Sequence, residues 1–480
     1  MRVLCAFPEA MASSSSRPPS CLALVALFLA LLLHLSLSFH AGNRRPLPVD
    51  RATGLKEKTL ILLDVSTKNP VRTVNENFLS LQLDPSIIHD GWLDFLSSKR
   101  LVTLARGLSP AFLRFGGKRT DFLQFQNLRN PAKSRGGPGP DYYLKNYEDE
   151  PNDYRSIHGR AVNGSQLGKD YIRLKSLLQP IRLYSRASLY GPNIGRPRKN
   201  VIALLDGFMK VAGSTVDAVT WQHCYIDGRV VKVMDFLKTR LLDTLSDQIR
   251  KIQKVVNTYT PGKKIWLEGV VTTSAGGTNN LSDSYAAGFL WLNTLGMLAN
   301  QGIDVVIRHS FFDHGYNHLV DQNFNPLPDY WLSLLYKRLI GPKVLAVHVA
   351  GLQRKPRPGR VIRDKLRIYA HCTNHHNHNY VRGSITLFII NLHRSRKKIK
   401  LAGTLRDKLV HQYLLQPYGQ EGLKSKSVQL NGQPLVMVDD GTLPELKPRP
   451  LRAGRTLVIP PVTMGFYVVK NVNALACRYR

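Results

Sequence analysis

One stretch of the chain combines a strand, an acidic residue and a glycine turn in a way that can present chemistry. The apolar run at 265–267 leads directly into Glu268 and Gly269, and a β-branched run then reaches Gly276-Gly277. A helical pattern begins near Asp283. A strand that ends in a loop and is followed by a helix is typical of an α/β barrel, which presents its chemistry at the carboxyl ends of its strands. Glu268 is therefore the first candidate functional residue.

The segments around this stretch alternate between strand and helix periodicity. Helices are predicted at 168–178, 201–211, 230–256, 283–300 and 329–340, and strands at 187–192 with an exit loop, 218–221, 265 onward and 305–307. Two earlier buried strands are predicted at 59–63 and 111–115. This alternation predicts an α/β fold with a parallel sheet, either closed as a barrel or doubly wound.

The pattern changes beyond residue 350. Short β-type runs separated by turns occur at 366–369, 385–392, 413–415, 456–459 and 466–469. Such spacing is typical of a β-sandwich. We therefore predict three parts: a leader at 1–41, a β/α domain at 42–350 and a sandwich-like domain at 351–480.

The charge of the chain predicts a polyanionic partner. Its 480 residues include 67 Lys and Arg against 33 Asp and Glu, a formal net charge of +34. A field of this sign attracts nucleic acid or sulfated polysaccharide, and charge alone does not separate them. A dense basic run at the start of the third part, with two prolines that keep it extended, is a candidate binding segment: Arg354, Lys355, Arg357, Arg360, Arg363, Lys365 and Arg367. The alternative is a solvated basic loop.

The leader separates the two polyanions. Arg2 and Arg17 precede an apolar run that starts at Cys21, and small residues follow near Ala41. This predicts a secretory signal peptide, with an uncleaved anchor as the alternative. No later segment approaches the roughly 18 apolar residues of a membrane span. We expect a secreted chain at the cell surface and in the extracellular matrix, where sulfated polysaccharide is the partner and nucleic acid is not.

The cysteines and two sequons fit a secreted chain. Cys224, Cys372 and Cys477 lie after the leader, so one disulfide and one free thiol are the simplest arrangement. Asn163 and Asn280 each begin an Asn-X-Ser glycosylation sequon. The four histidines at 371–378 have no spacing that fits a tetrahedral metal site, so no metal or other cofactor is expected.

Several motifs together resemble one family. They are LRFGGKRTDFL, NGSQLGKDYI, YGPNIGRPRK, VTWQHCYIDGR, GKKIWLEG, YAAGFLWL, NPLPDYWLSLL, KSVQLNG and the final Ala476-Cys477. They resemble the heparanases of glycoside hydrolase family 79 and cover nearly the whole chain after the leader. The resemblance implies a (β/α)8 TIM-type barrel with a C-terminal β-sandwich, and cleavage of heparan sulfate by a retaining mechanism.

The chain departs from this family at the nucleophile. The family's strand ends in Trp-Leu-Gly-Glu, whereas here the order is Trp266-Leu267-Glu268-Gly269. Because successive strand side chains point to opposite faces, we expect the displaced carboxylate to turn from the barrel mouth toward the helices or a wall. Gly269 occupies the nucleophile position. Glu268 can replace the nucleophile only if a β-bulge re-aims it.

A second departure concerns the acid/base. Glu150, in Glu150-Pro151-Asn152, matches the end of the family's Asn-Glu-Pro motif, but the apolar strand that should precede it is missing. The family carries on the order of a hundred residues between Gly117 and this motif, which is two to four β/α units. We therefore predict an incomplete barrel that lacks an internal segment near 149–150.

The resemblance also assigns roles to other residues. It implies a vestigial sugar-binding cleft at Asp84, His223, Tyr225, Arg229 and Gly315, and a heparin-binding stretch at Arg196, Arg198, Lys199 and Lys210. His223 has a simpler alternative as a packed histidine at a strand end. The resemblance also pairs Cys372 with Cys477 and leaves Cys224 free.

Two functions follow from these features. The favoured one is a secreted, catalytically inactive heparanase-like protein that binds heparan sulfate proteoglycans and antagonises or associates with active heparanase. The alternative is an active retaining endo-β-glucuronidase with Glu150 as acid/base and Glu268 as nucleophile. Nucleic-acid binding is opposed by the leader and the sequons.

Overall fold

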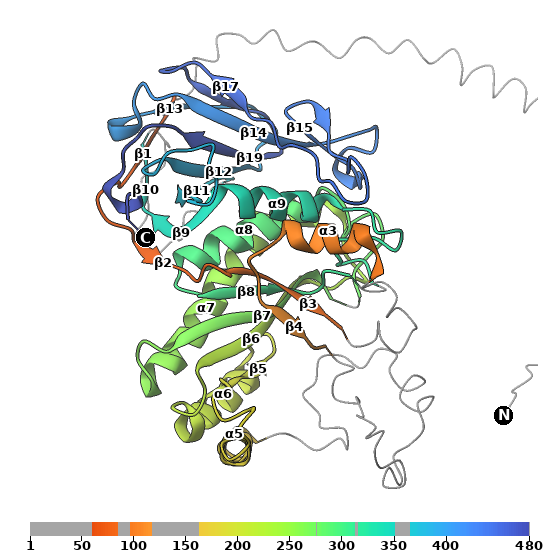
Figure 1. Cartoon of the computed structure of the whole chain (residues 1–480), viewed down its shortest axis with the longest axis vertical. Coiled ribbons are helices and arrows are strands. Elements are labelled where there is room, and N and C mark those ends of the chain that lie inside the picture. The colour runs from red at the N-terminus through yellow and green to blue at the C-terminus, as the bar shows by residue number, and fades with distance from the viewer. Residues whose placement is uncertain are drawn as a thin grey trace, which may run out of the picture. The chain divides into compact units, whose positions relative to one another are not determined.

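The structure is a computed structural model that describes residues 60–84, 97–117, 163–274, 276–312, 315–350 and 365–479 (Figure 1). The predicted leader, Glu150 and five residues of the dense basic run (Arg354, Lys355, Arg357, Arg360 and Arg363) lie outside these ranges. No helix in the described ranges is both long and apolar enough to cross a membrane.

A curled parallel sheet forms the first layer. Its six strands lie in the order β4-β3-β8-β7-β6-β5, and every neighbouring pair is parallel. The strands are β3 (Leu79–Leu83), β4 (Leu113–Phe115), β5 (Tyr190–Ile194), β6 (Ala218–Ile226), β7 (Lys264–Thr273) and β8 (Val305–Arg308). The predicted α/β barrel architecture is confirmed, with six strands in the described part of the chain.

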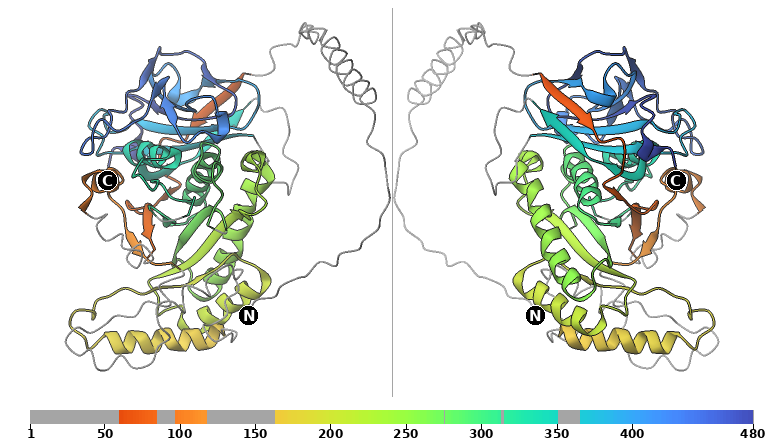
Figure 2. Two further views of the ribbon diagram at one scale, coloured as in Figure 1. Left: turned by 90° about the vertical axis from the view of Figure 1, so that its right-hand side faces the viewer. Right: turned by 90° about the vertical axis from the view of Figure 1, so that its left-hand side faces the viewer.

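Helices cover one face of this sheet (Figures 1 and 2). They are α3 (Lys99–Gly107), α5 (Gly164–Leu178), α6 (Lys199–Ala212), α7 (Thr239–Tyr259), α8 (Ala287–Asn300) and α9 (Pro328–Leu339). The helix predicted at 230–256 is divided into a 3-10 turn, Val233–Leu237, and α7. The division falls at Lys238, whose extended backbone (ψ 108°) interrupts the helix.

Alternation along β7 decides which residues meet the helices. Ile265, Leu267 and Val270 belong to the large core that includes the helices, whereas Trp266 packs in a separate small cluster on the other face. This second face is called the inner face below, because it corresponds to the interior of a closed barrel. Period-two alternation thus separates a helix-facing side from an inner side.

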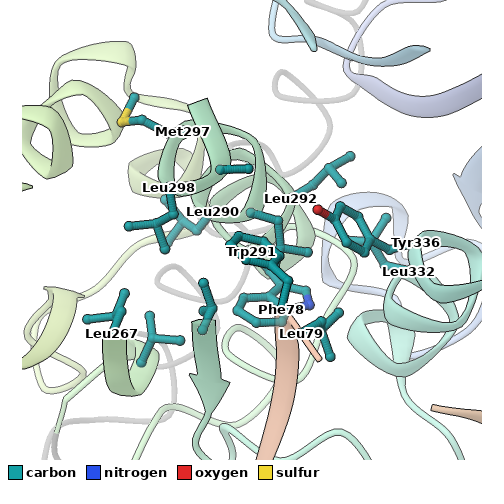
Figure 3. Close-up of a cluster of buried hydrophobic side chains, with 14 of the residues drawn as sticks. Phe78, Leu79, Leu267, Leu290, Trp291, Leu292, Met297, Leu298, Leu332 and Tyr336 are labelled. Atoms are coloured by element: carbon teal, nitrogen blue, oxygen red, sulfur yellow. The ribbon is translucent and has the colours of Figure 1, made fainter. Parts of the chain in front are cut away.

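Helix α8 is buried all round because it lies between the parallel sheet and the sandwich. Figure 3 shows Leu290, Trp291 and Leu298 of α8 in the same cluster as Leu267 of β7 and Phe78 before β3. On the sandwich side, a Cβ added at Gly296 would lie 2.6 Å from the Tyr369 ring, so only glycine allows this approach. The two layers therefore share one continuous core.

The β-sandwich consists of two sheets. The larger follows the order β16-β15-β14-β19-β12-β11-β9-β2, with β17 paired to β14, and the smaller follows β10-β1-β13-β18. The larger sheet contains β2 (Arg72–Thr73), β9 (Ile340–Leu345), β11 (Leu366–Thr373), β12 (Ile385–Asn391), β14 (Val410–Pro417), β15 (Val428–Leu430), β16 (Gln433–Pro434), β17 (Arg449–Leu451) and β19 (Thr463–Val469). The smaller contains β1 (Ile61–Val65), β10 (Val347–Ala350), β13 (Lys397–Leu401) and β18 (Leu457–Ile459).

The first described strand belongs to the sandwich. β1 pairs with β13 in parallel and with β10 antiparallel, and its Ile61, Leu63 and Val65 enter the core between the two sheets. The sequence pattern predicts this strand but not its partners, because a short apolar run does not specify which sheet it joins. The domain division at residue 350 remains a prediction. β1 comes before this boundary in the sequence but pairs with β13, which comes after it.

A disulfide fastens the sandwich. Cys372 in β11 is bonded to Cys477 across 105 residues, with a Cα–Cα distance of 5.3 Å. Cys224 is a free thiol. The pairing implied by the family resemblance is therefore present.

Candidate functional site

A polar cluster on the inner face joins five strands of the parallel sheet. Its centre is Arg114 of β4, whose Nε lies 2.6 Å from Oε1 of Glu268 in β7. Arg114 Nη1 donates to Gln82 Oε1 at 2.8 Å, and Gln82 Nε2 donates to the carbonyl of Gly116 at 2.6 Å. The arginine fork therefore binds a carboxylate and an amide at once, as guanidinium geometry allows.

Asn193 of β5 completes this cluster. In the amide orientation that satisfies its neighbours, its Oδ1 accepts from Arg114 Nη2 at 2.8 Å and from Gln222 Nε2 at 3.0 Å. Its Nδ2 donates to the backbone carbonyl of Glu268 at 3.1 Å. Because β4 and β5 are the two edges of the sheet, the contact between Arg114 and Asn193 shows how far the sheet curls.

Glu268 follows the regular alternation of β7, and a bulge comes directly after it. The pairing register between β7 and β8 shifts between Glu268 and Val270, and Gly269 between them has φ +94°. A bulge inserts one extra residue and re-aims a side chain. Glu268 lies two residues after Trp266 and before the bulge, so regular alternation places it on the inner face beside Arg114. This corrects the expectation that the carboxylate turns toward the helices, because the bulge re-aims Gly269 and not Glu268. The carboxylate is only 15% exposed.

Gly269 also faces the inner side. A Cβ built there would lie 3.5 Å from Gln222 Cγ and 3.6 Å from both Arg114 Nη1 and Gln82 Oε1. A side chain at this position would therefore enter the polar cluster, but the positive φ favours glycine. The position that the family gives to its nucleophile faces the site and carries no functional group.

An aromatic stack lies one layer below the polar cluster. The Trp266 ring stacks on Tyr190 at 4.3 Å and on Phe112 at 5.3 Å between ring centroids. These residues come from β7, β5 and the start of β4, so they too join both edges of the sheet. The stack forms an apolar floor beneath the Arg114–Glu268 pair.

His223 and Tyr225 do not reach the inner face. His223 is 2% exposed and contacts the ring of Tyr225, and the Tyr225 hydroxyl is 2.8 Å from Thr294 Oγ1 on α8. Burial lowers the pKa of His223 to about 3, with nearby Arg196 acting in the same direction. Burial raises the pKa of Tyr225. Both side chains face the helices, which corrects the predicted cleft assignment and matches the packed-histidine alternative.

Three other predicted cleft residues lie at loop positions. Asp84 directly follows β3, where a Cβ on Gly117 would come within 1.9 Å of its Oδ2. Arg229 is exposed and pairs with Asp227 at 2.8 Å, and this hydrogen bonding lowers the pKa of Asp227 to about 2. Gly315 precedes Tyr316, whose amide donates to the carbonyl of Gly276 at 2.7 Å. Their roles toward a sugar stay predictions.

Asn317 connects the loop after β8 to the end of β7. Asn317 is buried, its Nδ2 donates to the Thr273 carbonyl at 2.8 Å, and its Oδ1 accepts from Thr272 at 3.1 Å. Tyr316 is 40% exposed. The asparagine therefore fastens the loop after β8 to the end of β7.

A buried ion pair at the end of β8 was missed by sequence reasoning. Arg308 Nη2 lies 2.9 Å from Asp329 Oδ2 at the start of α9, and its guanidinium lies 4.9 Å from the centre of the Trp291 ring. Burial raises the pKa of Asp329, and the Arg308 charge opposes that shift. The sequence signal that could have indicated this pair is Asp329, an acidic residue that follows Pro328 in the first turn of a predicted helix.

The predicted polyanion-binding residues are separated. Arg196, Arg198 and Lys199 lie together between β5 and α6, and the last two are exposed. Lys210 lies in the last turn of α6, eleven residues from Lys199, which is about 16 Å along the helix. The predicted heparin-binding stretch therefore consists of a small cluster, Arg196, Arg198 and Lys199, and a distant Lys210.

Arg367 is buried and cannot serve the predicted basic run. It is 8% exposed, its Nη2 lies 2.7 Å from Asp243, and its Nη1 donates to Asn293 Oδ1 at 3.2 Å. Lys365 beside it is exposed. The alternation of β11 explains the correction, because it turns residue 367 toward α7 and α8.

Both sequon asparagines lie at the surface, whereas His371 of the histidine-rich segment is buried. Asn163 and Asn280 are exposed, and the Asn163 side chain caps α5 by accepting from Ser165 N at 2.8 Å. Glycosylation of both stays a prediction. His371 is buried with its Nδ1 2.8 Å from the carbonyl of Gly341. Within the described ranges, no three His, Cys, Asp or Glu side chains lie close enough to hold a metal ion.

Comparison with known proteins decides the family. No family model matches the chain. The chain is 81% identical over 592 residues to "Inactive heparanase-2" of Mus musculus, covering all of both proteins, and 38% identical over 512 residues to "Heparanase" of Mus musculus, covering 86% of this chain and 94% of the relative. The chain belongs to the heparanase family. The first alignment spans 592 residues whereas this chain has 480, so this family member lacks positions that the relative carries.

Solved structures support the fold. A GH51 arabinofuranosidase from Xanthomonas axonopodis pv. citri superposes with a TM-score of 0.55 at 12% identity, covering 86% of this chain and 100% of the other. A 4-O-α-L-rhamnosyl-β-D-glucuronidase from Fusarium oxysporum 12S superposes with a TM-score of 0.56 at 11% identity, covering 85% of this chain and 100% of the other. At these identities the likeness concerns architecture alone, a barrel-type glycosidase fold.

Proposed function

We propose that this chain is a secreted member of the heparanase family that binds heparan sulfate without cleaving it. The observation that carries the proposal is the order Glu268-Gly269 on the inner face of β7. It gives the nucleophile position to Gly269, and it leaves the neighbouring carboxylate of Glu268 bound to Arg114.

The chemistry of retention explains why this arrangement disfavours cleavage. A retaining glycosidase uses two carboxyl groups about 5–5.5 Å apart, and the nucleophile must reach the anomeric carbon. Here an arginine fork holds the carboxylate of Glu268, and Asn193 binds the backbone at the same residue. Attack by Glu268 would require the pair with Arg114 to break inside a partly buried site. The relative named "Inactive heparanase-2" supports the same reading.

Charge supports binding. The net charge of +34 attracts a sulfated chain, and exposed Arg198 and Lys199 beside Arg196 offer a first contact cluster. A protein that binds heparan sulfate and leaves it intact withholds the substrate from an active heparanase. We therefore include antagonism by competition for the polysaccharide in the proposal.

The test of the first part is incubation of the purified chain with end-labelled heparan sulfate, followed by size-exclusion chromatography. We expect the label to elute at its original size, while an active heparanase shortens it. Shortening by this chain that disappears in Glu268→Gln or in Glu150→Gln would establish the alternative, an active endo-β-glucuronidase.

The test of antagonism uses the same assay with active heparanase present. Adding the chain should slow shortening, and excess unlabelled heparan sulfate should reduce the effect of the added chain. Inhibition that excess polysaccharide does not relieve would instead indicate direct association with the enzyme. If active heparanase is not inhibited at a concentration of the chain that saturates the heparan sulfate, antagonism is removed from the proposal.

A further inference from the structure

The smaller sheet of the sandwich carries a basic outer surface. Alternation along β13 buries Ile399 and Leu401 in the sandwich core and turns Lys398 and Lys400 to the opposite side. On that side Lys400 pairs with Leu62 of β1 and Lys398 pairs with Val458 of β18. Leu62 and Val458 are 41% and 46% exposed, so this face of the sheet is open.

Arginines from the flanking turns extend this surface at both ends of β13. At one end, Asn391 Nδ2 donates to the carbonyls of Ser395 and Pro460, at 3.2 and 2.7 Å, which fastens the turn bearing Arg394 and Arg396 to the end of β18. At the other end, Lys400 Nζ donates to the carbonyl of Gly454, which lies in the turn between Arg452 and Arg455. The amide of Arg455 donates to the carbonyl of Arg452 at 3.2 Å.

The resulting set is called the β13 surface: Arg394, Arg396, Lys398, Arg452 and Arg455. All five are exposed. Asp64 and Asp407 are the acidic residues placed near it, through contacts with Gly403 and Gly454. Positive charge therefore dominates, over a span of about 13 Å between residues 396 and 400 at roughly 3.3 Å per residue.

We propose that the β13 surface is a binding site for sulfated polysaccharide, separate from the inner face of the parallel sheet. An arginine fork can donate two parallel N–H bonds to two oxygens of one sulfo group, and several such contacts release counterions from the polyanion. The fixed backbone of the sheet holds the cations at strand spacing. The inference rests on the proposed function because both name the same ligand class.

The composition of the sheet favours polysaccharide over nucleic acid. Its four strands read ILLDV, VHVA, KKIKL and LVI, and contain no Phe, Tyr or Trp. Proteins that bind single-stranded nucleic acid combine basic grooves with aromatic side chains on which bases stack. This surface offers charge and aliphatic side chains, which suit a ligand that presents sulfo groups and sugar hydroxyls.

The test measures the affinity of the full chain for a size-defined heparin oligosaccharide as a function of salt. The surface variant carries Arg394→Ser, Arg396→Ser and Arg455→Ser. The matched control carries Arg240→Ser, Lys251→Ser and Lys254→Ser, which removes the same charge from exposed positions on α7. Because each lost contact lowers the salt slope by about one unit, the surface variant should lose about three and bind on the order of tenfold more weakly. The control should stay close to the unmodified chain.

The outcomes separate this inference from the proposed function. If the unmodified chain binds heparin and the two variants behave alike, the β13 surface is wrong and the proposed function stands. If the unmodified chain does not bind heparin, the proposed function fails and this site fails with it. If a single-stranded DNA oligonucleotide of equal charge binds as tightly and is weakened by the same variant, the polysaccharide assignment is overturned. Equal thermal midpoints of the two variants confirm that the comparison concerns binding.

Discussion

Arg114 connects more of the inner face than any other residue described above. It binds Glu268, Gln82 and Asn193 from three different strands, and it does so from the edge strand β4. The pair with Glu268 is 19% and 15% exposed, so its charges are little screened by solvent. Removing one partner of such a pair leaves an uncompensated charge, which costs more than the pair itself contributes.

Substitution Arg114→Met should therefore destabilise the fold by about 2–3 kcal/mol, less than for a fully buried pair. Adding Glu268→Gln should recover part of that loss, because the stranded carboxylate becomes neutral. Urea unfolding of both variants measures this. The exposed pair Lys447–Glu445, at 3.5 Å, is the matched control, and Lys447→Met should change stability by less than about 0.5 kcal/mol. Equal effects at the two sites would show that the inner pair has no special role.

At the scale of single residues, the sequence predicted those features that depend only on which amino acid occupies a position. The exchange of Glu268 and Gly269 could be seen in the sequence, whereas the free thiol at Cys224 was implied by the family resemblance. The direction of Glu268 could not be seen there, because the expectation counted position 269 as part of the regular alternation, whereas Gly269 is the bulge residue and Glu268 alternates regularly with Trp266. His223 and Tyr225 failed for a different reason: they continue the regular alternation of Val219 and Trp221, which face the helices, whereas the cleft assignment rested on the family resemblance alone.

The buried His223 should make the protein sensitive to acid. Its folded-state pKa of about 3 lies below the ordinary value of 6.5, so between these values the unfolded chain binds a proton that the folded chain does not. Stability should therefore fall as pH falls through 6.5 and continue to fall to about pH 3. Replacing it by His223→Phe should reduce the loss between pH 7 and pH 5 by about 2 kcal/mol. Equal losses in urea titrations of both proteins would contradict this account.

At the scale of elements, periodicity predicted most strands and helices of the parallel sheet. It did not reveal that β1 joins the sandwich, or that Arg367 faces α7 and α8. Partner choice depends on surfaces far apart in the chain, and a local pattern carries no information about them. The disulfide partner was available only from the family resemblance.

The Cys372–Cys477 disulfide should stabilise the sandwich substantially. It closes a loop of 105 residues, and removing a crosslink of this length costs about 2–4 kcal/mol. Cys477→Ser should show this loss in urea unfolding, and reductant should then have no further effect. Cys224→Ser, the free-thiol control, should change stability by about 1 kcal/mol or less. Reductant that leaves the stability of the unmodified chain unchanged would contradict the prediction.

At the scale of the whole molecule, the curled sheet brings its two edges together through side chains. Arg114 meets Asn193, and Phe112 and Tyr190 stack on Trp266 from opposite edges. Leu113, Phe115 and Tyr190 are still 61%, 45% and 43% exposed. Leu113 and Phe115 alternate with Arg114 and pair with Leu81 and Leu83, so they lie on the helix-facing side, which the described helices leave partly uncovered at this edge. Tyr190 lies on the inner side, where this edge of the sheet remains open. Sequence reasoning expected an incomplete barrel but not these contacts between its edges.

The most direct test of the account is a thermal melt of the purified chain with and without a size-defined heparin oligosaccharide. We predict one cooperative transition, because the sheet, α8 and the sandwich share a continuous core. A ligand at about 100 times its Kd stabilises the native state by about 2.7 kcal/mol, which raises the midpoint by about 3 °C for a chain of this size. A broad transition that heparin leaves unmoved would contradict both the folded six-stranded sheet and the binding of sulfated polysaccharide.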